Sequence, residues 1–274
     1  MKIIDARVRL RTTEMLQPWT DDLHPAFHDY IEKYHMQDRL SVMPTEELLS
    51  LAGESGIDRI VVCGTDRVEN KHIGELAHKF EQIIPVGGVS VSSGINHALR
   101  EITELHDQKF AAVNFGFGEK LNVNDKLFYP LYGVCEYFDI PIIVHSSVHF
   151  WRGAYMWKGQ PQYFDEIAVD FPALKIIMSH GGNGFGPTVL AVAQRHPNIY
   201  LEFSALRPKY MAPEFIQAAN TYLKHKCIFG TDYPLIDFSE QVKVWKYSLR
   251  EEVWPLFFHD NILSALYGKP IPAL

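Results

Sequence analysis

Cysteine is scarce in this chain, which also lacks long apolar runs and any excess of basic residues. Only three of the 274 residues are cysteines: Cys63, Cys135 and Cys227. They are odd in number, widely spaced and set in apolar surroundings, so we expect free buried thiols in a reducing compartment. This pattern excludes a small disulfide-stabilised secreted domain.

No segment reaches the roughly 18 to 20 consecutive apolar residues that a helix needs to cross a bilayer. Charges at Lys2, Asp5, Arg7, Arg9 and Arg11 interrupt the first residues, so we expect no signal peptide there. The sequence therefore predicts a cytoplasmic protein with no membrane partner.

Basic residues do not dominate, because Lys and Arg total 26 against 33 Asp and Glu, for a formal net charge of −7. Such a balance disfavours nucleic acid as a partner. Linker-like stretches are also missing, and 47% of the residues are hydrophobic, so the chain can bury one large core. We expect a single domain over residues 1–274; the sequence leaves open whether it forms a homo-oligomer.

Short β-branched runs alternate with helical patterns along the whole chain, which indicates βα units around a parallel sheet. A doubly wound open sheet would show the same alternation, but polar residues at the strand ends favour a closed barrel. We therefore predict an α/β protein that forms one (β/α)8 TIM barrel. The eight candidate strands are residues 2–8, 59–63, 83–87, 111–115, 141–145, 175–178, 199–203 and 227–230.

Residues 11–43 interrupt this alternation with an aromatic and histidine-containing segment in place of a short loop. An insertion after the first strand of a barrel lies above the C-terminal face, where active sites are built. Two interpretations are equally open: a lid over the site, or an irregular packing subdomain.

Arg7 and Arg9 are two residues apart on the first predicted strand, so their side chains share one face. If Ile4, Ala6 and Val8 pack toward the helices, both arginines face the barrel axis and its mouth. Alternatively they point outward to surface carboxylates. A guanidinium has no lone pair and stays protonated, so neither arginine can be a metal ligand.

Three other strand ends carry proton carriers or potential metal ligands: His145, His180 and Asp232. One such histidine is more often structural, but three groups at the same mouth indicate a catalytic site. Glu202, at the end of the seventh strand, and Trp151, after the fifth, are candidate substrate contacts.

Several passages resemble the amidohydrolase-related family, in the branch that includes aminocarboxymuconate semialdehyde decarboxylase and resorcylate decarboxylase. The resemblance covers nearly the whole chain and is strongest at three strand ends. The passages are Tyr129-Pro130-Leu131-Tyr132 through Ile142-Ile143-Val144-His145, Ser179-His180-Gly181-Gly182, Phe229-Gly230-Thr231-Asp232-Tyr233-Pro234 and Asn261-Ile262-Leu263.

The resemblance implies a (β/α)8 enzyme with one divalent ion, usually zinc. In the family a His-x-His pair on strand one, the strand-five histidine and the strand-eight aspartate hold this ion. By position His145 and Asp232 would be ligands, and His180 the acid–base group or a further ligand. This chain departs from the pattern, because Arg7-Val8-Arg9 stands where the His-x-His pair belongs.

Two arginines bring a charge of +2 toward the place of the ion. Each repulsion costs about 4 kcal/mol at 4 Å with an effective dielectric constant near 20. We therefore expect no metal, or one weakly held divalent ion, with zinc the first choice. In that arrangement one arginine pairs with Asp232, and the other binds an anionic group of the ligand.

Arginine cannot lower the pKa of water as zinc does, so hydrolysis of an unactivated amide is disfavoured. We predict an amidohydrolase-superfamily enzyme that acts on a small carboxylate-bearing molecule, as hydrolase of a labile bond or as lyase of the decarboxylase or hydratase type. His180, Asp232 and His145 would be catalytic, and Arg7 and Arg9 would bind the anion. The alternative is a barrel that has lost catalysis and binds a metabolite or a protein.

Overall fold

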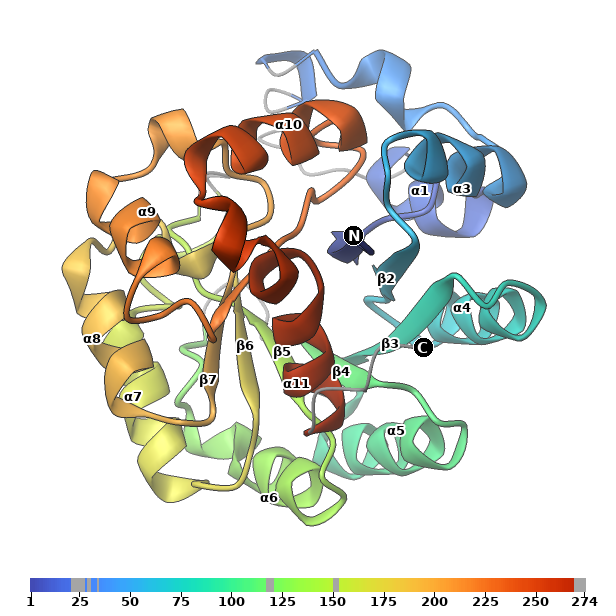
Figure 1. The fold of residues 1–274 in the computed structure, drawn as a ribbon. Coiled ribbons are helices and arrows are strands. Elements are labelled where there is room, and N and C mark those ends of the chain that lie inside the picture. Colours follow the sequence, from blue (N-terminus) through green and yellow to red (C-terminus); the bar gives the residue numbers. More distant parts are fainter. Residues whose placement is uncertain (21–27, 29–30, 34, 117–120, 150–152, 269–274) are drawn as a thin grey trace.

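The chain forms a barrel of eight parallel strands surrounded by helices (Figure 1). The computed structural model describes residues 1–20, 28, 31–33, 35–116, 121–149 and 153–268. The strands pair in chain order and the backbones of the first and last meet, with Ala6 N donating to Phe229 O at 3.1 Å and Arg9 N to Tyr233 O at 2.8 Å. The predicted TIM barrel is confirmed.

The strands are β1 Ile4–Val8, β2 Arg59–Cys63, β3 Ile83–Ser90, β4 Ala112–Gly116, β5 Ile142–His145, β6 Ile176–Ser179, β7 Ile199–Glu202 and β8 Cys227–Ile228. The helices are α1 Thr13–Thr20, α3 Thr45–Glu54, α4 Arg67–Lys79, α5 Ile95–Asp107, α6 Tyr129–Tyr137, α7 Pro161–Asp170, α8 Pro187–Arg195, α9 Pro213–Asn220, α10 Phe238–Ser248 and α11 Asn261–Tyr267. Each predicted strand overlaps an observed one, because buried parallel strands read as β-branched runs.

Two apolar clusters divide the core. The larger one lies between the strands and the surrounding helices. The smaller one fills the barrel, with residues such as Val61, Ile143, Ile177 and Ile228, and it also includes four residues of α11. On two of these strands the next inward position toward the carboxyl end is polar, His145 after Ile143 and Ser179 after Ile177. The barrel is therefore apolar inside and carries its chemistry at the carboxyl-terminal mouth.

The first strand departs from regular alternation. We expected Ile4 and Ala6 to face the helices, but both belong to the cluster inside the barrel. The pairing of β1 with β2 shifts register between Asp5 and Val8, and Val8 lies in the outer cluster. Ile4 and Ala6 thus point into the barrel, and the register shift that follows allows the Arg7 side chain to reach the barrel mouth, which strict alternation would not.

The described parts of segment 11–43 are attached to the turn after β8. Arg11 donates to the Tyr233 hydroxyl at 3.2 Å, and Arg39 donates to the Leu235 carbonyl at 2.6 Å. Met15 and Met36 are buried. Both ends of the segment are thus anchored beside the barrel mouth.

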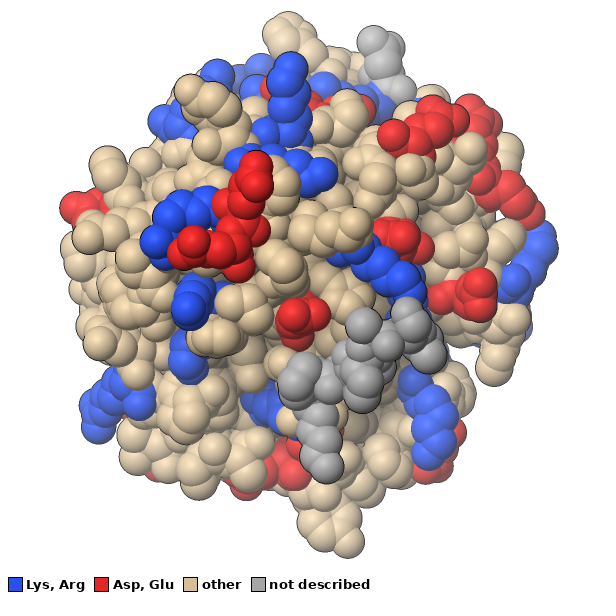
Figure 2. Space-filling view, in the orientation of Figure 1, with Lys and Arg blue, Asp and Glu red and all other residues tan. Residues whose placement is uncertain are grey.

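The three cysteines are buried and unpaired, as the sequence predicts. Among the described residues, no helix is long and apolar enough to cross a membrane. On the face shown in Figure 2, acidic and basic side chains both occur, and neither sign covers the face alone.

We predict that Gly88→Ala destabilises the barrel, whereas Gly53→Ala does not. A Cβ on Gly88 in β3 would lie 2.4 Å from backbone atoms of Thr65, which cannot move aside without disturbing the β2 end. Such overpacking costs about 1–3 kcal/mol. Gly53, exposed in α3, has open space, and alanine there should add about 0.5–1 kcal/mol of stability. Urea unfolding of both variants measures the difference, and equal stabilities would contradict the close packing.

Candidate active site

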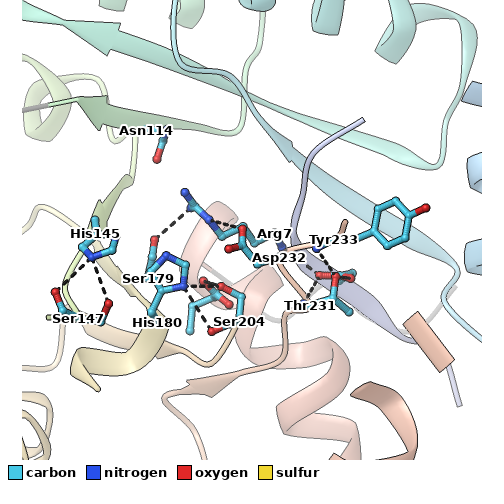
Figure 3. A network of polar contacts seen from close by, with 12 residues as sticks. Arg7, Asn114, His145, Ser147, Ser179, His180, Ser204, Thr231, Asp232 and Tyr233 are labelled. Carbon is cyan, nitrogen blue, oxygen red and sulfur yellow. Dashed lines mark hydrogen bonds and ion pairs between the residues drawn. The ribbon is translucent and has the colours of Figure 1, made fainter. Parts of the chain in front are cut away.

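Four of the residues predicted from strand ends meet at the barrel mouth (Figure 3). Arg7 comes from β1, His145 ends β5, His180 follows β6 and Asp232 follows β8. The ring centroids of His145 and His180 are 4.8 Å apart. Parallel strands in a barrel present their carboxyl ends to one region, which is why residues so distant in sequence converge.

Arg7 links the two sides of this group. Its Nε lies 3.2 Å from Asp232 Oδ1, and its Nη1 donates to Ser179 Oγ at 3.1 Å. The side chains of Arg7 and Asp232 are 19% and 28% exposed, so the pair lies at the mouth without being sealed from it. The expected ion pair between Asp232 and a strand-one arginine is therefore present, and Arg7 forms it.

Arg9 does not lie beside Arg7 in this role. Its guanidinium forms a buried ion pair with Glu69 of α4, and its Nε donates to the Met15 carbonyl at 2.8 Å. Glu69 Oε2 also accepts from Thr65 N at 2.8 Å. The expectation of two arginines facing one ligand therefore differs from the structure, in which Arg9 joins β1 to α4 and to the start of segment 11–43.

His145 is held at the end of β5 by its own loop. Its Nε2 lies 3.1 Å from both the hydroxyl and the carbonyl oxygen of Ser147, and its ring stacks on that of His149 at 3.9 Å. Burial, followed by the neighbouring His180 and His149, holds the pKa of His145 well below its ordinary value. His145 is therefore neutral at pH 7.

His180 and Asp232 share a backbone feature that the sequence does not reveal. Their φ angles are +62° and +60°, in the left-handed region that residues with a Cβ seldom adopt. After His180 the chain continues through Gly181 and Gly182, also at positive φ. Strained conformations of this kind gather at functional sites. In the turns after β6 and β8, the left-handed backbone therefore sets the direction of the His180 and Asp232 side chains, which would otherwise be set by strand alternation.

The His180 ring is anchored on its Nδ1 side. Nδ1 lies 3.0 Å from Ser204 Oγ and 3.3 Å from the Ser204 carbonyl oxygen. Burial lowers the pKa of His180 to about 4, although the nearby Asp232 carboxylate opposes the shift. His180 is thus neutral at pH 7 and able to accept a proton.

Glu202 lies behind His180. Its side chain is almost fully buried, and Oε2 accepts from Ser204 Oγ at 2.9 Å. Burial raises the pKa of Glu202 to about 8, against the opposing effect of Arg7. We predicted Glu202 as a substrate contact, and the structure places it in contact with Ser204. Trp151, the other predicted substrate contact, lies outside the described residues.

The donor set does not fit a metal ion bridging these strands. The Arg7 guanidinium, with no lone pair and a positive charge, occupies the space between Asp232 and the end of β6. His145 Nε2 is turned to Ser147, and His180 Nδ1 to Ser204. Within the part of the chain that the structure describes, no three His, Cys, Asp or Glu side chains are grouped to hold an ion.

Two cavities lie away from this group of residues. One, of about 370 Å³, lies between α4 and α5 and is lined by residues such as Arg67 and Glu101. The other, of about 380 Å³, is lined by Met1, Ile57 and Gln82. Neither cavity is lined by the strand-end residues. The candidate active site is therefore placed at the barrel mouth, where those side chains converge.

Three contacting residues are not predicted from the sequence: Ser179, Ser147 and Glu69. Ser179 immediately precedes His180 and shares the inward face of β6 with Ile177, so alternation could have identified it. Ser147 follows His145 by two residues, a weak signal. Glu69 lies on a helix 60 residues from Arg9, and no local pattern indicates their pairing.

We predict that Glu202→Gln becomes more stable relative to the wild type as pH rises. Because burial raises the folded-state pKa from 4.5 to about 8, the folded protein keeps a proton that the unfolded chain releases. The unfolding free energy of the wild type therefore decreases as pH rises from 4.5 to about 8, and glutamine at position 202 removes this decrease. Unfolding free energies of both proteins at pH 5, 6, 7 and 8 test this. A difference that does not change with pH would contradict the assignment.

Comparisons with known proteins bear on the fold and on the family. A sequence comparison with curated proteins gave no match. Solved structures of similar fold include an uncharacterized TIM-barrel protein from Bordetella bronchiseptica, with 24% identity, coverage of 97% of this chain and 98% of the other, and a TM-score of 0.80. A 5-carboxyvanillate decarboxylase from Sphingomonas paucimobilis has 13% identity, the same two coverages and a TM-score of 0.72. A 2,6-dihydroxybenzoate decarboxylase from Rhizobium has 16% identity, coverage of 97% and 98%, and a TM-score of 0.69.

The sequence profile described as Amidohydrolase matches residues 4–267, which include every strand and all the strand-end residues discussed above. The resemblance inferred from the strand-end passages is thereby confirmed. This chain belongs to the amidohydrolase family.

Proposed function

We propose that this chain is an enzyme that acts on a small carboxylate-bearing molecule, as hydrolase of a labile bond or as lyase. The observation that carries the proposal is the placement of Arg7. Among the described residues its Nη2 has no hydrogen-bond partner, and it is not among the buried atoms lacking one. An accessible nitrogen with two donors beside two neutral histidines suits a carboxylate.

The local charge supports an anionic ligand. Arg7 and Asp232 compensate each other, while burial keeps Glu202 protonated and both histidines neutral at pH 7. The Lys158 side chain, itself buried, acts electrostatically on His145 and His149. A carboxylate entering this group therefore meets the Arg7 guanidinium without repulsion from an ionised Glu202.

Relatives of similar fold support the choice of substrate class. Two of them are the decarboxylases of 5-carboxyvanillate and 2,6-dihydroxybenzoate, and a third is a 4-oxalomesaconate hydratase from Rhodopseudomonas palustris. Each of these names a carboxylate-bearing molecule. For this chain we assign His180 as the proton carrier, Asp232 as the group that stabilises its charged form, and His145 as a wall of the site.

Metal use differs among the relatives. A 5-carboxyvanillate decarboxylase from Novosphingobium aromaticivorans is complexed with manganese, and an amidohydrolase from Burkholderia multivorans has bound zinc. A divalent ion is thus compatible with this fold. For this chain we propose that such an ion, zinc first, is held weakly if at all, because Arg7 opposes it. From the three buried, unpaired cysteines we also propose a cytoplasmic location.

We predict that aromatic carboxylates or dicarboxylates raise the melting temperature and that Arg7→Gln abolishes this shift. At a hundredfold excess over the dissociation constant the stabilisation is about 2.7 kcal/mol. Arg195→Gln, which removes an exposed arginine of α8, is the matched control and should keep the shift. Each variant is compared with its own ligand-free melting temperature.

Arg9→Gln and His180→Gln extend this test. Arg9→Gln should lower stability but keep the shift, since Arg9 faces Glu69. His180→Gln should keep binding and lose turnover, because a proton carrier acts mainly in the transition state. A wild type that responds to no carboxylate would refute the proposal, and binding without turnover would favour a barrel that only binds its ligand.

We predict that the double variant Arg7→His/Arg9→His contains more zinc than the wild type after purification without chelator. The change removes two positive charges and adds one imidazole at position 7, beside Asp232, and a second at position 9 of the same strand. Arg7→Gln/Arg9→Gln, which removes the charge and adds no imidazole, separates the two effects. Elemental analysis measures the metal, and stoichiometric, tightly held metal in the wild type would show that the charge argument is wrong.

A further inference from the structure

The Nδ1 atom of His180 faces two oxygens of one residue. The Ser204 carbonyl oxygen lies at 3.3 Å and the Ser204 hydroxyl oxygen at 3.0 Å. A carbonyl oxygen can only accept a hydrogen bond, so the carbonyl favours a proton on Nδ1. The hydroxyl could either donate or accept, and its own second contact decides between these.

That second contact is Glu202. Ser204 Oγ donates to Glu202 Oε2 at 2.9 Å. A hydroxyl has one proton, so once this proton is given to Glu202 the oxygen can only accept from His180. Both oxygens beside Nδ1 are then acceptors.

The Glu202 carboxyl group cannot readily turn to another partner. Its Oε1 is buried without a hydrogen-bond partner, and a Cβ on Gly230 would lie 2.3 Å from it. The absence of a side chain at Gly230 thus makes room for the carboxyl group at the end of β7. An ionised Glu202, or a neutral one with its proton on Oε1, keeps Oε2 an acceptor from Ser204. A proton on Oε2 would reverse the Ser204 hydroxyl contact, and the Ser204 carbonyl, which can only accept, still favours a proton on Nδ1.

We infer that Ser204 and Glu202 are positioning residues that fix His180 with its proton on Nδ1 and a lone pair on Nε2. His180 then takes a proton in the first proton transfer of the reaction. This inference rests on the proposed role of His180 and goes beyond it, since it assigns the direction of the first step and two residues that set it.

The opposite side of the ring is placed to perform that step. Among the described residues Nε2 has no hydrogen-bond partner, and it is not one of the buried atoms lacking one. In the step, the bond between a hydrogen and a substrate or water atom breaks, its electron pair stays on that atom, and an N–H bond forms at Nε2. Asp232 stabilises the resulting imidazolium, and the proton is returned to the product.

This direction narrows the reaction class. Addition of water, hydrolysis and removal of a proton from a hydroxyl or carbon acid all begin by taking a proton. A decarboxylation that begins by protonating a ring carbon requires a proton on Nε2 at the start. The geometry therefore favours a reaction that begins with a base.

The ring nitrogens can be observed directly. The full-length protein is labelled with ¹⁵N-histidine, and two-bond ¹H–¹⁵N spectra distinguish a protonated from an unprotonated ring nitrogen, with His180→Asn identifying the signal. We expect Nδ1 to be protonated and Nε2 unprotonated in the wild type. A proton on Nε2 would overturn the inference, whatever the protein turns over.

Variants test which residues set this tautomer. Ser204→Ala should introduce the second tautomer of His180, and kcat should fall by the factor by which the Nδ1-protonated fraction falls, with KM unchanged. Ser147→Ala, which removes the hydroxyl beside His145 instead, should leave the His180 signal unaltered. An unaltered His180 signal in Ser204→Ala would refute the role of Ser204. If the wild type shows the expected tautomer but turns over no carboxylate, the proposed function fails and the tautomer assignment stands.

Discussion

The ion pair between Arg7 and Asp232 joins the first strand to the turn after the last, and the site is arranged around it. The two residues are also linked through the backbone, since Asp232 N donates to Arg7 O at 2.9 Å. Beside them, Asp5 accepts from Thr231 N at 2.9 Å and from its hydroxyl at 2.6 Å. These contacts join β1 to the turn after β8. The contacts that close the barrel therefore also bring Arg7 and Asp232 together.

Charge compensation explains why two arginines two residues apart have different roles. Removing one partner of a buried ion pair costs about 3–5 kcal/mol, because the remaining charge is left uncompensated. Arg9 therefore requires Glu69, which in turn accepts from Thr65 at the end of β2. Arg7, less buried and paired with Asp232, keeps one nitrogen available. The proposed ligand-binding role therefore falls to Arg7, while Arg9 is committed to the fold.

The strands and the strand-end histidines could be predicted from sequence because each depends on local periodicity. Ile142 to His145 is an apolar run that ends in a polar residue, and it can be recognised as a strand with a polar end without knowledge of distant residues. The phase of β1 could not be predicted, since it depends on a register shift against β2. Nor could the partner of Arg9, because the pairing of a strand residue with a helix residue arises only from packing.

The protons in this site are distributed unusually. At pH 7 the more acidic residue type, Glu202, retains its proton, while the more basic type, His180, lacks one, and burial is the leading cause of both pKa shifts. A neutral Glu202 adds no negative charge beside Arg7, which leaves the guanidinium attractive to an anion. A neutral His180 has an unshared electron pair ready at the same place. Burial thus has two effects on the proposed binding of an anion. The low polarity keeps Glu202 and His180 neutral, and it also strengthens the electrostatic interaction of Arg7 with the charge that a ligand would bring.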